Sequence, residues 1–131
     1  MKIYVAGKFE NKEAILEVHK RLEKMGHSIS YNWTTHQNIK PYTTNQEMAC
    51  TYAQNEIDGI FNSDCFIYFS AEKGHTLLME FGAALMLAKV TSKPKIYAIG
   101  EFNNESPWFF NPLVTRKNNI EEVYKEIGEN K

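Results

Sequence analysis

Apolar and polar residues follow one another along the chain in blocks that predict alternating strands and helices. Short apolar runs, such as residues 3–6, are typical of strands buried on both faces. Longer segments with apolar residues three or four positions apart, such as 11–25, are typical of amphipathic helices. The predicted strands are 3–6, 27–33, 65–69, 95–99 and a short one at 113–114, and the predicted helices are 11–25, 45–61, 76–89 and 120–127.

This order of elements predicts the fold class. Strands that alternate with helices through brief turns are expected to run parallel, with helices on both faces of one sheet. The simplest such arrangement is a flavodoxin-like, Rossmann-like α/β fold of about five strands, with the first strand central. A chain of 131 residues, 43% of them apolar, is long enough for one core. We therefore predict a single domain over residues 1–131.

The composition narrows the class of partner. A net charge of −1 gives no long-range attraction to polymeric nucleic acid or to an anionic membrane. No window approaches a membrane-spanning length, and the chain opens directly into a predicted strand. Cys50 and Cys65 lie in a predicted helix and strand without metal-ligand spacing, so we expect reduced, buried thiols. We expect a cytoplasmic protein that acts on a small molecule, with no metal or other cofactor.

Two stretches lack periodicity. Residues 34–45 are polar and contain Pro41, and an irregular stretch of this length is either a lid or binding loop or a plain surface connection. The second stretch, 101–111, contains Trp108, Phe109 and Phe110. Aromatic residues of this kind cover the edge of a core or form a subunit contact.

A carboxylate follows the third predicted strand, near the place where open α/β sheets bind ligands. Glu80 falls about 100° from the centre of the apolar stripe of helix 76–89, which consists of residues 77, 78, 81, 84, 85 and 88. In the first turns of that helix, the positive dipole end is expected to favour its anionic form. The alternative is an ordinary solvated glutamate.

A second carboxylate occupies an apolar position. Glu56 falls inside the apolar stripe of helix 45–61, one turn from Tyr52 and Ile60. Burial of a carboxylate is costly, so we expect either a raised pKa and a role as proton donor, or a side chain that reaches water past the sheet edge. One anionic and one protonated carboxyl group form the pair that cleaves glycosidic bonds.

Several segments together resemble the nucleoside 2-deoxyribosyltransferase superfamily, which includes the 2′-deoxynucleoside 5′-monophosphate N-glycosidases. The resemblance runs from the first strand to about Lys89, with a weaker echo in the last strand and helix. Each segment is weak alone, but their order and spacing make a fairly specific set. The segments are 3–9 (IYVAGKF), 26–33 (GHSISYNW), 55–60 (NEIDGI) with Ser63 and Asp64, 73–76 (KGHT) and 79–85 (MEFGAAL).

The resemblance implies three catalytic roles. Glu80 would attack the anomeric carbon of the sugar and form a covalent glycosyl-enzyme intermediate. Glu56 stands where the family has an aspartate that protonates or holds the departing base, so the longer side chain is a departure from the pattern. Tyr4 corresponds to a first-strand tyrosine that bonds the nucleophile in some members.

The expected substrate-binding set comes partly from the resemblance and partly from the chemistry of the residues. Trp33 matches a tryptophan that follows the second strand, where it stacks on a base or packs in the core. Six residues before Glu80, the family often has a polar side chain, whereas this chain has Gly74. Its backbone, the helix start and Lys73 could cradle a 5′-phosphate, an interpretation that rests on physical chemistry and not on the family's motif. The expected set is Gly7, Lys8, Phe9, Trp33, Lys73, Gly74, Thr76 and His75, for which an exposed loop histidine is the alternative.

We therefore expect cleavage of the N-glycosidic bond of a nucleoside or a nucleoside 5′-monophosphate, deoxy or not, with hydrolysis or transfer of the sugar to another base. The replaced residues at positions 56 and 74 leave open a non-catalytic nucleotide-binding or signalling module. A third possibility is an NAD-type N-glycosidase, because one fold hosts many reactions. The resemblance also implies a homodimer or a higher homo-oligomer.

Overall fold

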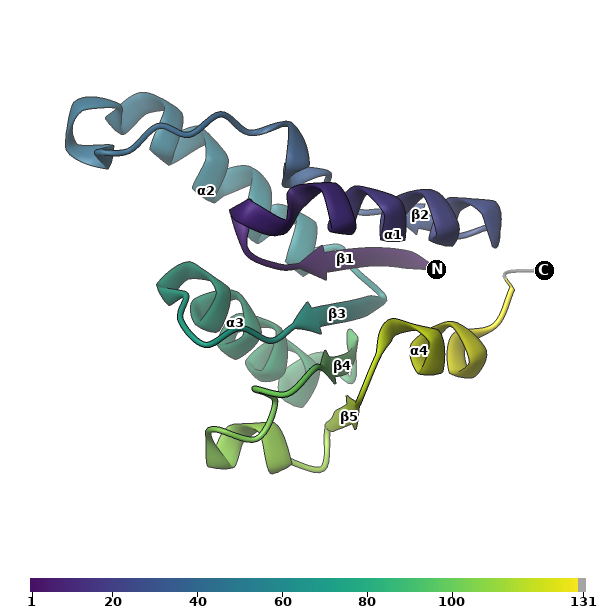
Figure 1. Ribbon diagram of the computed structural model, residues 1–131. Coiled ribbons are helices and arrows are strands. Elements are labelled where there is room, and N and C mark those ends of the chain that lie inside the picture. Colours follow the sequence, from purple (N-terminus) through teal and green to yellow (C-terminus); the bar gives the residue numbers. More distant parts are fainter. Residues whose placement is uncertain (130–131) are drawn as a thin grey trace.

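The chain folds around one parallel sheet in a computed structural model that describes residues 1–129. The strands are β1 (Lys2–Ala6), β2 (Ser28–Ile29), β3 (Cys65–Phe69), β4 (Lys95–Ile99) and β5 (Val114–Lys117). Their order is β2-β1-β3-β4-β5, and all neighbours run parallel. This is the predicted flavodoxin-like α/β fold (Figure 1), although β3 rather than β1 holds the middle position.

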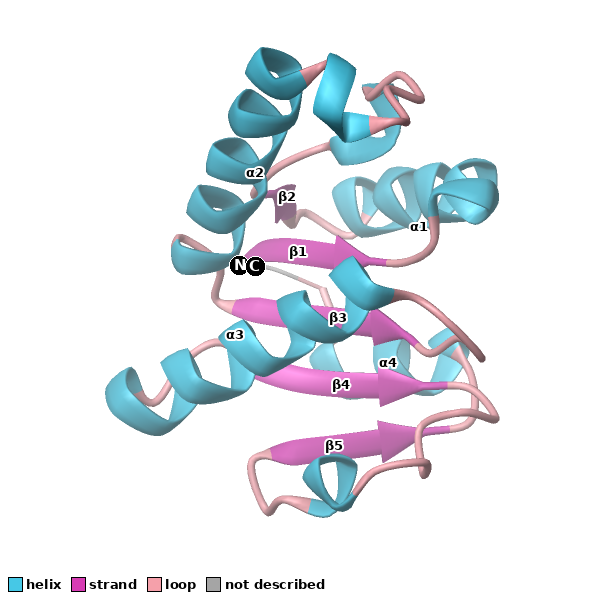
Figure 2. Ribbon diagram, turned by 90° about the vertical axis from the view of Figure 1, so that its left-hand side faces the viewer, coloured by secondary structure: helices cyan, strands magenta, loops and turns pink. Residues whose placement is uncertain are grey.

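Helices cover both faces of the sheet, as predicted. They are α1 (Lys12–Lys24), α2 (Gln46–Phe61), α3 (His75–Thr91) and α4 (Ile120–Ile127). α2 and α3 lie over one face, and α1 and α4 lie over the other (Figure 2). On the second face, the guanidinium of Arg21 lies 4.9 Å from the centre of the Tyr124 ring. No helix within residues 1–129 is long and apolar enough to cross a membrane.

The second strand is much shorter than predicted. β2 pairs only with β1, so this edge of the sheet ends after two residues. The chain then turns at Asn32, whose side chain accepts a hydrogen bond of 3.0 Å from the Thr34 N–H and begins a short 3₁₀ helix. Trp33 therefore belongs to this turn and not to a strand, and its indole N–H donates to the Val5 carbonyl at 2.6 Å.

Two of the predicted helix faces differ from the observed ones. In α3, Leu78 is 51% exposed, while the other five stripe residues are buried. In α2, only Gly59 and Ile60 are buried, and Ile57 and Phe61 are exposed. Most of α2, including apolar positions in its last turns, is therefore not buried in the core, and its apolar pattern does not report burial. Cys50 on α2 is accordingly exposed, which corrects its predicted burial, while Cys65 is buried.

The aromatic cluster after β4 divides between core and surface. Phe109 is 3% exposed, and the centre of its ring lies 4.7 Å from the centre of the Phe81 ring. Trp108 and Phe110 are more than half exposed. The last strand, predicted at 113–114, begins one residue later and is longer, because its pairing with β4 continues to Lys117.

Candidate active site

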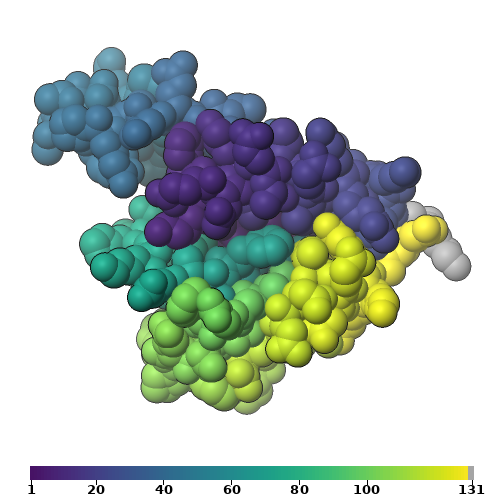
Figure 3. Space-filling view, viewed as in Figure 1, coloured from purple at the N-terminus to yellow at the C-terminus, as the bar shows by residue number. Residues whose placement is uncertain are grey.

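The segments that follow β1 and β3 border a cavity of about 550 Å³. Its other walls come from α2 and from residues 36–42, so part of the polar stretch 34–45 lines the cavity. Figure 3 shows this part of the chain, in blue, projecting beyond the rest of the molecule. The residues of the expected site that line the cavity are Gly7, Lys8, Phe9, Trp33, Glu56, Gly74, His75, Thr76 and Glu80.

Glu80 is buried more deeply than the sequence pattern suggested. It is the sixth residue of α3, beyond the first turn, and its Oε2 atom is buried without a hydrogen-bond partner within the described part of the chain. Loss of hydration and the nearby charge of Glu56 raise the pKa of Glu80 to about 8. The expectation of a dipole-stabilised anion is therefore wrong for the free protein, because burial outweighs the helix dipole at this depth.

Tyr4 affects the site through its contact with the Glu80 carboxyl group. It does not line the cavity, and its side chain is fully buried in β1. Its hydroxyl approaches the Glu80 carboxyl and opposes the increase in the pKa of Glu80. Within residues 1–129, the hydroxyl has no hydrogen bond of good geometry, so the contact between the two groups is incompletely formed. Burial and the charge of Glu80 together raise the pKa of Tyr4 and keep its hydroxyl protonated.

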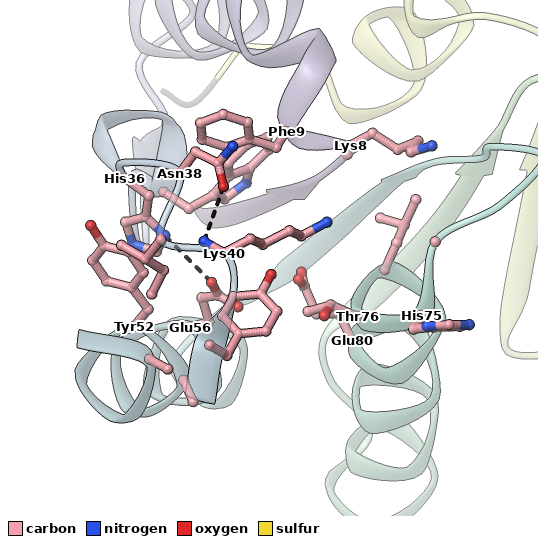
Figure 4. Close-up of a pocket in the computed structure, with 18 of the residues that line it drawn as sticks. Lys8, Phe9, His36, Asn38, Lys40, Tyr52, Glu56, His75, Thr76 and Glu80 are labelled. Atoms are coloured by element: carbon pink, nitrogen blue, oxygen red, sulfur yellow. Dashed lines mark hydrogen bonds and ion pairs between the residues drawn. The ribbon is translucent and has the colours of Figure 1, made fainter. Parts of the chain in front are cut away.

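Glu56 reaches the same cavity from the opposite wall. Its side chain is 19% exposed, and burial raises its pKa. Figure 4 shows the carboxyl groups of Glu56 on α2 and Glu80 on α3 facing the same space. Because the charge of Glu56 raises the pKa of Glu80, the two groups titrate as a coupled pair. Near neutral pH, such a pair retains one proton, so one of the two groups is a carboxylic acid and the other a carboxylate.

His36 is a site residue that the sequence analysis missed. Its Nδ1 atom lies 3.5 Å from Glu56 Oε1, and its Nε2 atom lies 2.5 Å from the Tyr31 hydroxyl oxygen. Its ring stacks on Tyr52 with 3.6 Å between ring centres and 3° between planes. A single histidine in a stretch without periodicity carries no sequence signal, and only the folded loop brings it to Glu56.

Two lysine side chains line the same cavity. Lys8 and Lys40 line it together with His75, at the start of α3. Lys40 was also missed by the sequence analysis, while Lys73 is exposed and does not line the cavity. In Figure 4, the ring of His75 points away from the two glutamates. Lys73, the lysine expected to hold a phosphate, therefore lies outside the cavity, and Lys8 and Lys40 are the lysines that line it.

The apolar part of the wall includes the rings of Phe9 and Trp33. Trp33 is 6% exposed and held by its hydrogen bond to Val5, so it packs in the core and also borders the cavity. Phe9 is 37% exposed, and the Lys12 ammonium lies 4.8 Å from its ring centre. Both rings offer flat surface to a base. In the part of the chain that the structure describes, no group of three or more His, Cys, Asp or Glu side chains is placed to hold a metal ion.

A solved structure has the same fold. The Clostridium botulinum CMP N-glycosidase BcmB aligns with 97% of this chain and 98% of its own, with a TM-score of 0.59 and 18% sequence identity. No protein-family model matches the chain, and no characterised protein matches its sequence. At this sequence identity, the likeness shows a shared fold. The chain shares its architecture, over nearly its whole length, with a CMP N-glycosidase.

Proposed function

We propose that the chain cleaves the N-glycosidic bond of a nucleoside 5′-monophosphate, with Glu80 as nucleophile and Glu56 as proton donor. The observation that carries this proposal is the coupling of two largely buried carboxyl groups across one cavity. Buried acids whose pKa values are raised by each other and by desolvation are typical of acid–base sites. The likeness to a CMP N-glycosidase supports the same class of reaction.

The first step uses the proton that the pair retains. The Glu80 carboxylate attacks the anomeric carbon, the bond from that carbon to the base nitrogen breaks with its electron pair going to the base, and Glu56 protonates the base. The product is a glycosyl ester on Glu80 and a free base. The Tyr4 hydroxyl contacts Glu80 and helps to hold it in its reactive position.

The second step restores the pair. Water attacks the anomeric carbon, the ester bond to Glu80 breaks, and the Glu56 carboxylate takes the proton of the water. Glu80 leaves as a carboxylate and Glu56 is again an acid. A second base in place of water gives transfer of the sugar.

The free protein favours a proton on Glu80, whereas the reaction needs Glu80 as a carboxylate. Positive charge that develops on the sugar as the base departs lies beside Glu80 and favours its ionised form. The proton of the pair then resides on Glu56, which faces the departing base. The raised pKa of Glu80 in the free protein is therefore compatible with its role as nucleophile.

The lysine side chains of the cavity favour a phosphorylated substrate. Lys8 and Lys40 line it together with the start of α3, where backbone N–H groups and the helix dipole attract anions. Phe9 and Trp33 supply the surface for the base. Lysines for a phosphate, carboxyl groups for the sugar and aromatic rings for a base thus line one cavity, which supports a nucleoside 5′-monophosphate as substrate.

The test is release of free base from a panel of nucleosides and their 5′-monophosphates, ribo and deoxy. We expect release from at least one monophosphate, loss of that release in Glu80→Gln, and a glycosyl adduct on the Glu80 peptide by mass spectrometry. Glu72→Gln is the matched control, because Glu72 is exposed and does not line the cavity. No release from any compound, or release that survives Glu80→Gln, contradicts the proposal. Binding without turnover, unaffected by Glu80→Gln, selects the non-catalytic alternative.

The same panel separates the remaining reactions. If the protein is a transferase, the sugar passes to an added second base, and the product is a new nucleotide instead of the hydrolysed sugar phosphate. Release of nicotinamide from NAD, in the absence of release from the nucleotides, selects the NAD-type alternative.

We also propose that the protein acts as a homo-oligomer. α2 and α3 lie over the same face of the sheet (Figure 2) and expose large apolar side chains. Ile57 and Phe61 on α2 are 63% and 67% exposed, and Met79, Met86 and Val90 on α3 are between 60% and 75% exposed. Apolar surface of this extent is usually covered by a partner, and a second copy offers the same two helices.

A further inference from the structure

The imidazole of His36 is held on three sides. Tyr52 stacks on one face, the Tyr31 hydroxyl meets Nε2, and Glu56 meets Nδ1. The side chain is 9% exposed, although the loop that carries it is mostly exposed. Tyr31 precedes the loop, whereas Tyr52 and Glu56 lie one turn apart on α2. A ring fixed by two tyrosines has little freedom, so its Nδ1 atom presents a fixed polar group to Glu56.

The proton positions follow from the partners. Burial lowers the pKa of His36, so the ring is neutral and carries one N–H. If Tyr31 donates its O–H to Nε2, the ring proton is on Nδ1 and points at Glu56 Oε1. The remaining oxygen of Glu56 is then free to carry an acid proton toward the cavity. The distance of 3.5 Å exceeds an ordinary hydrogen bond, as is common for catalytic contacts before substrate binds.

We propose that His36 is a positioning residue for Glu56, whose carboxyl group its Nδ1–H orients so that the acid proton faces the departing base. This inference rests on the proposed function. When Glu56 gives its proton to the base nitrogen, the bond to the sugar breaks and the electron pair goes to the base. The negative charge left on Glu56 then accepts the hydrogen bond from Nδ1–H. No proton leaves His36, and Tyr31 keeps the ring in the correct tautomer.

The first test is spectroscopic and needs no turnover. Nitrogen-15 NMR of the imidazole groups, with His36 assigned by comparison with His36→Asn, is expected to show the proton on Nδ1 in the wild type. In water, neutral histidine prefers the other tautomer, so the observation is specific. Tyr31→Phe removes the donor to Nε2 and is expected to shift the ring toward the Nε2–H form. An Nε2–H tautomer in the wild type overturns the proposal.

The second test uses two substitutions that differ in the nitrogen they replace. The amide nitrogen of asparagine stands near the place of Nδ1, whereas that of glutamine stands near the place of Nε2. We expect His36→Asn to retain most of the rate of base release and His36→Gln to lose on the order of tenfold or more. Equal melting temperatures of the two variants exclude a loss of folding as the cause. Equal rates of the two variants overturn the proposal.

A double-mutant cycle then links His36 to Glu56. If His36 acts through Glu56, adding His36→Gln to Glu56→Gln is expected to cause no further loss of rate. A further loss of tenfold shows that His36 acts elsewhere and overturns the inference. Absence of base release by the wild type defeats the proposed function instead, and the tautomer measurement still decides the proton position.

Discussion

Gly59 packs directly against Tyr4: a β-carbon at position 59 would lie 3.1 Å from the Tyr4 ring and 2.6 Å from Tyr31 Cβ. The missing side chain lets the end of α2 approach β1 closely. Glu56 lies one turn earlier on the same helix face, so this contact sets how far Glu56 reaches into the cavity.

Gly59→Ala should therefore lower both stability and the rate of base release. Overpacking at this contact is expected to cost roughly 1–3 kcal/mol of unfolding free energy. Gly82→Ala in α3 is the matched control, because its β-carbon would meet only Trp108 at 3.8 Å. That substitution should be neutral or stabilise by up to about 1 kcal/mol. Urea unfolding of both variants measures the difference, and equal effects would argue against tight packing at Gly59.

The coupled pair predicts a bell-shaped dependence of kcat/KM on pH. The reactive form holds one proton on Glu56 and Glu80 together. That proton leaves near the pKa of Glu80, which burial and the charge of Glu56 raise to about 8. The rate should thus fall above about pH 8 and also at acidic pH, where both groups are protonated.

Glu56→Gln tests the coupling. Removing the charge of Glu56 lowers the pKa of Glu80, because that charge is one of the causes of its increase. We expect the residual activity of the variant to lack the fall above about pH 8. If the rate falls above about pH 8 in the same way in wild type and variant, the fall reflects the titration of another group.

The two lysines that line the cavity predict selectivity for phosphate. Lys40→Ala and Lys8→Ala should lower kcat/KM for a 5′-monophosphate by roughly 10- to 100-fold and leave the corresponding nucleoside nearly unchanged. Lys20→Ala serves as control, since Lys20 pairs with Glu17 on the surface of α1 at 3.2 Å. Equal losses for both substrates would show that these lysines do not bind the phosphate.

The burial of His19 predicts that the stability of the fold decreases in acid, independently of the candidate active site. It is 2% exposed on α1, neither ring nitrogen has a hydrogen-bond partner within the described residues, and burial lowers its pKa to about 4. Between about pH 6.5 and 4, the unfolded chain binds a proton here that the folded chain does not, so stability falls as pH falls.

In that pH range, the contribution of His19 to the unfolding free energy changes by up to about 1.4 kcal/mol per pH unit. His19→Leu should remove it and flatten the dependence of the unfolding free energy on pH. Urea unfolding of both proteins between pH 7 and 4 measures the difference. Parallel curves would mean that His19 titrates normally in the folded protein.

The exposed faces of α2 and α3 predict self-association. Val90→Lys, at a position that is 75% exposed, should shift the protein toward the monomer in light scattering. Leu16→Lys on α1, at a position that is 37% exposed on the other face of the sheet, should not change the mass. A monomeric wild type would contradict the proposed assembly.

The sequence by itself determined the fold class, because runs such as 3–6 and 65–69 are apolar on both strand faces and only a sheet covered twice buries them. It also singled out Glu56 and Glu80 as unusual carboxyl groups. Their positions on helix stripes, together with the resemblance, were enough to predict a shared crevice.

Only the tertiary structure decided the electrostatics and the rest of the site. The depth of Glu80, and therefore its raised pKa, depends on how α3 packs against β1, which no local pattern reports. His36 and Lys40 come from a stretch without periodicity, so their sequence positions say nothing about which group they meet. The apolar pattern of α2 was misread as core, because an apolar stripe has the same period whether the chain itself or a partner covers it.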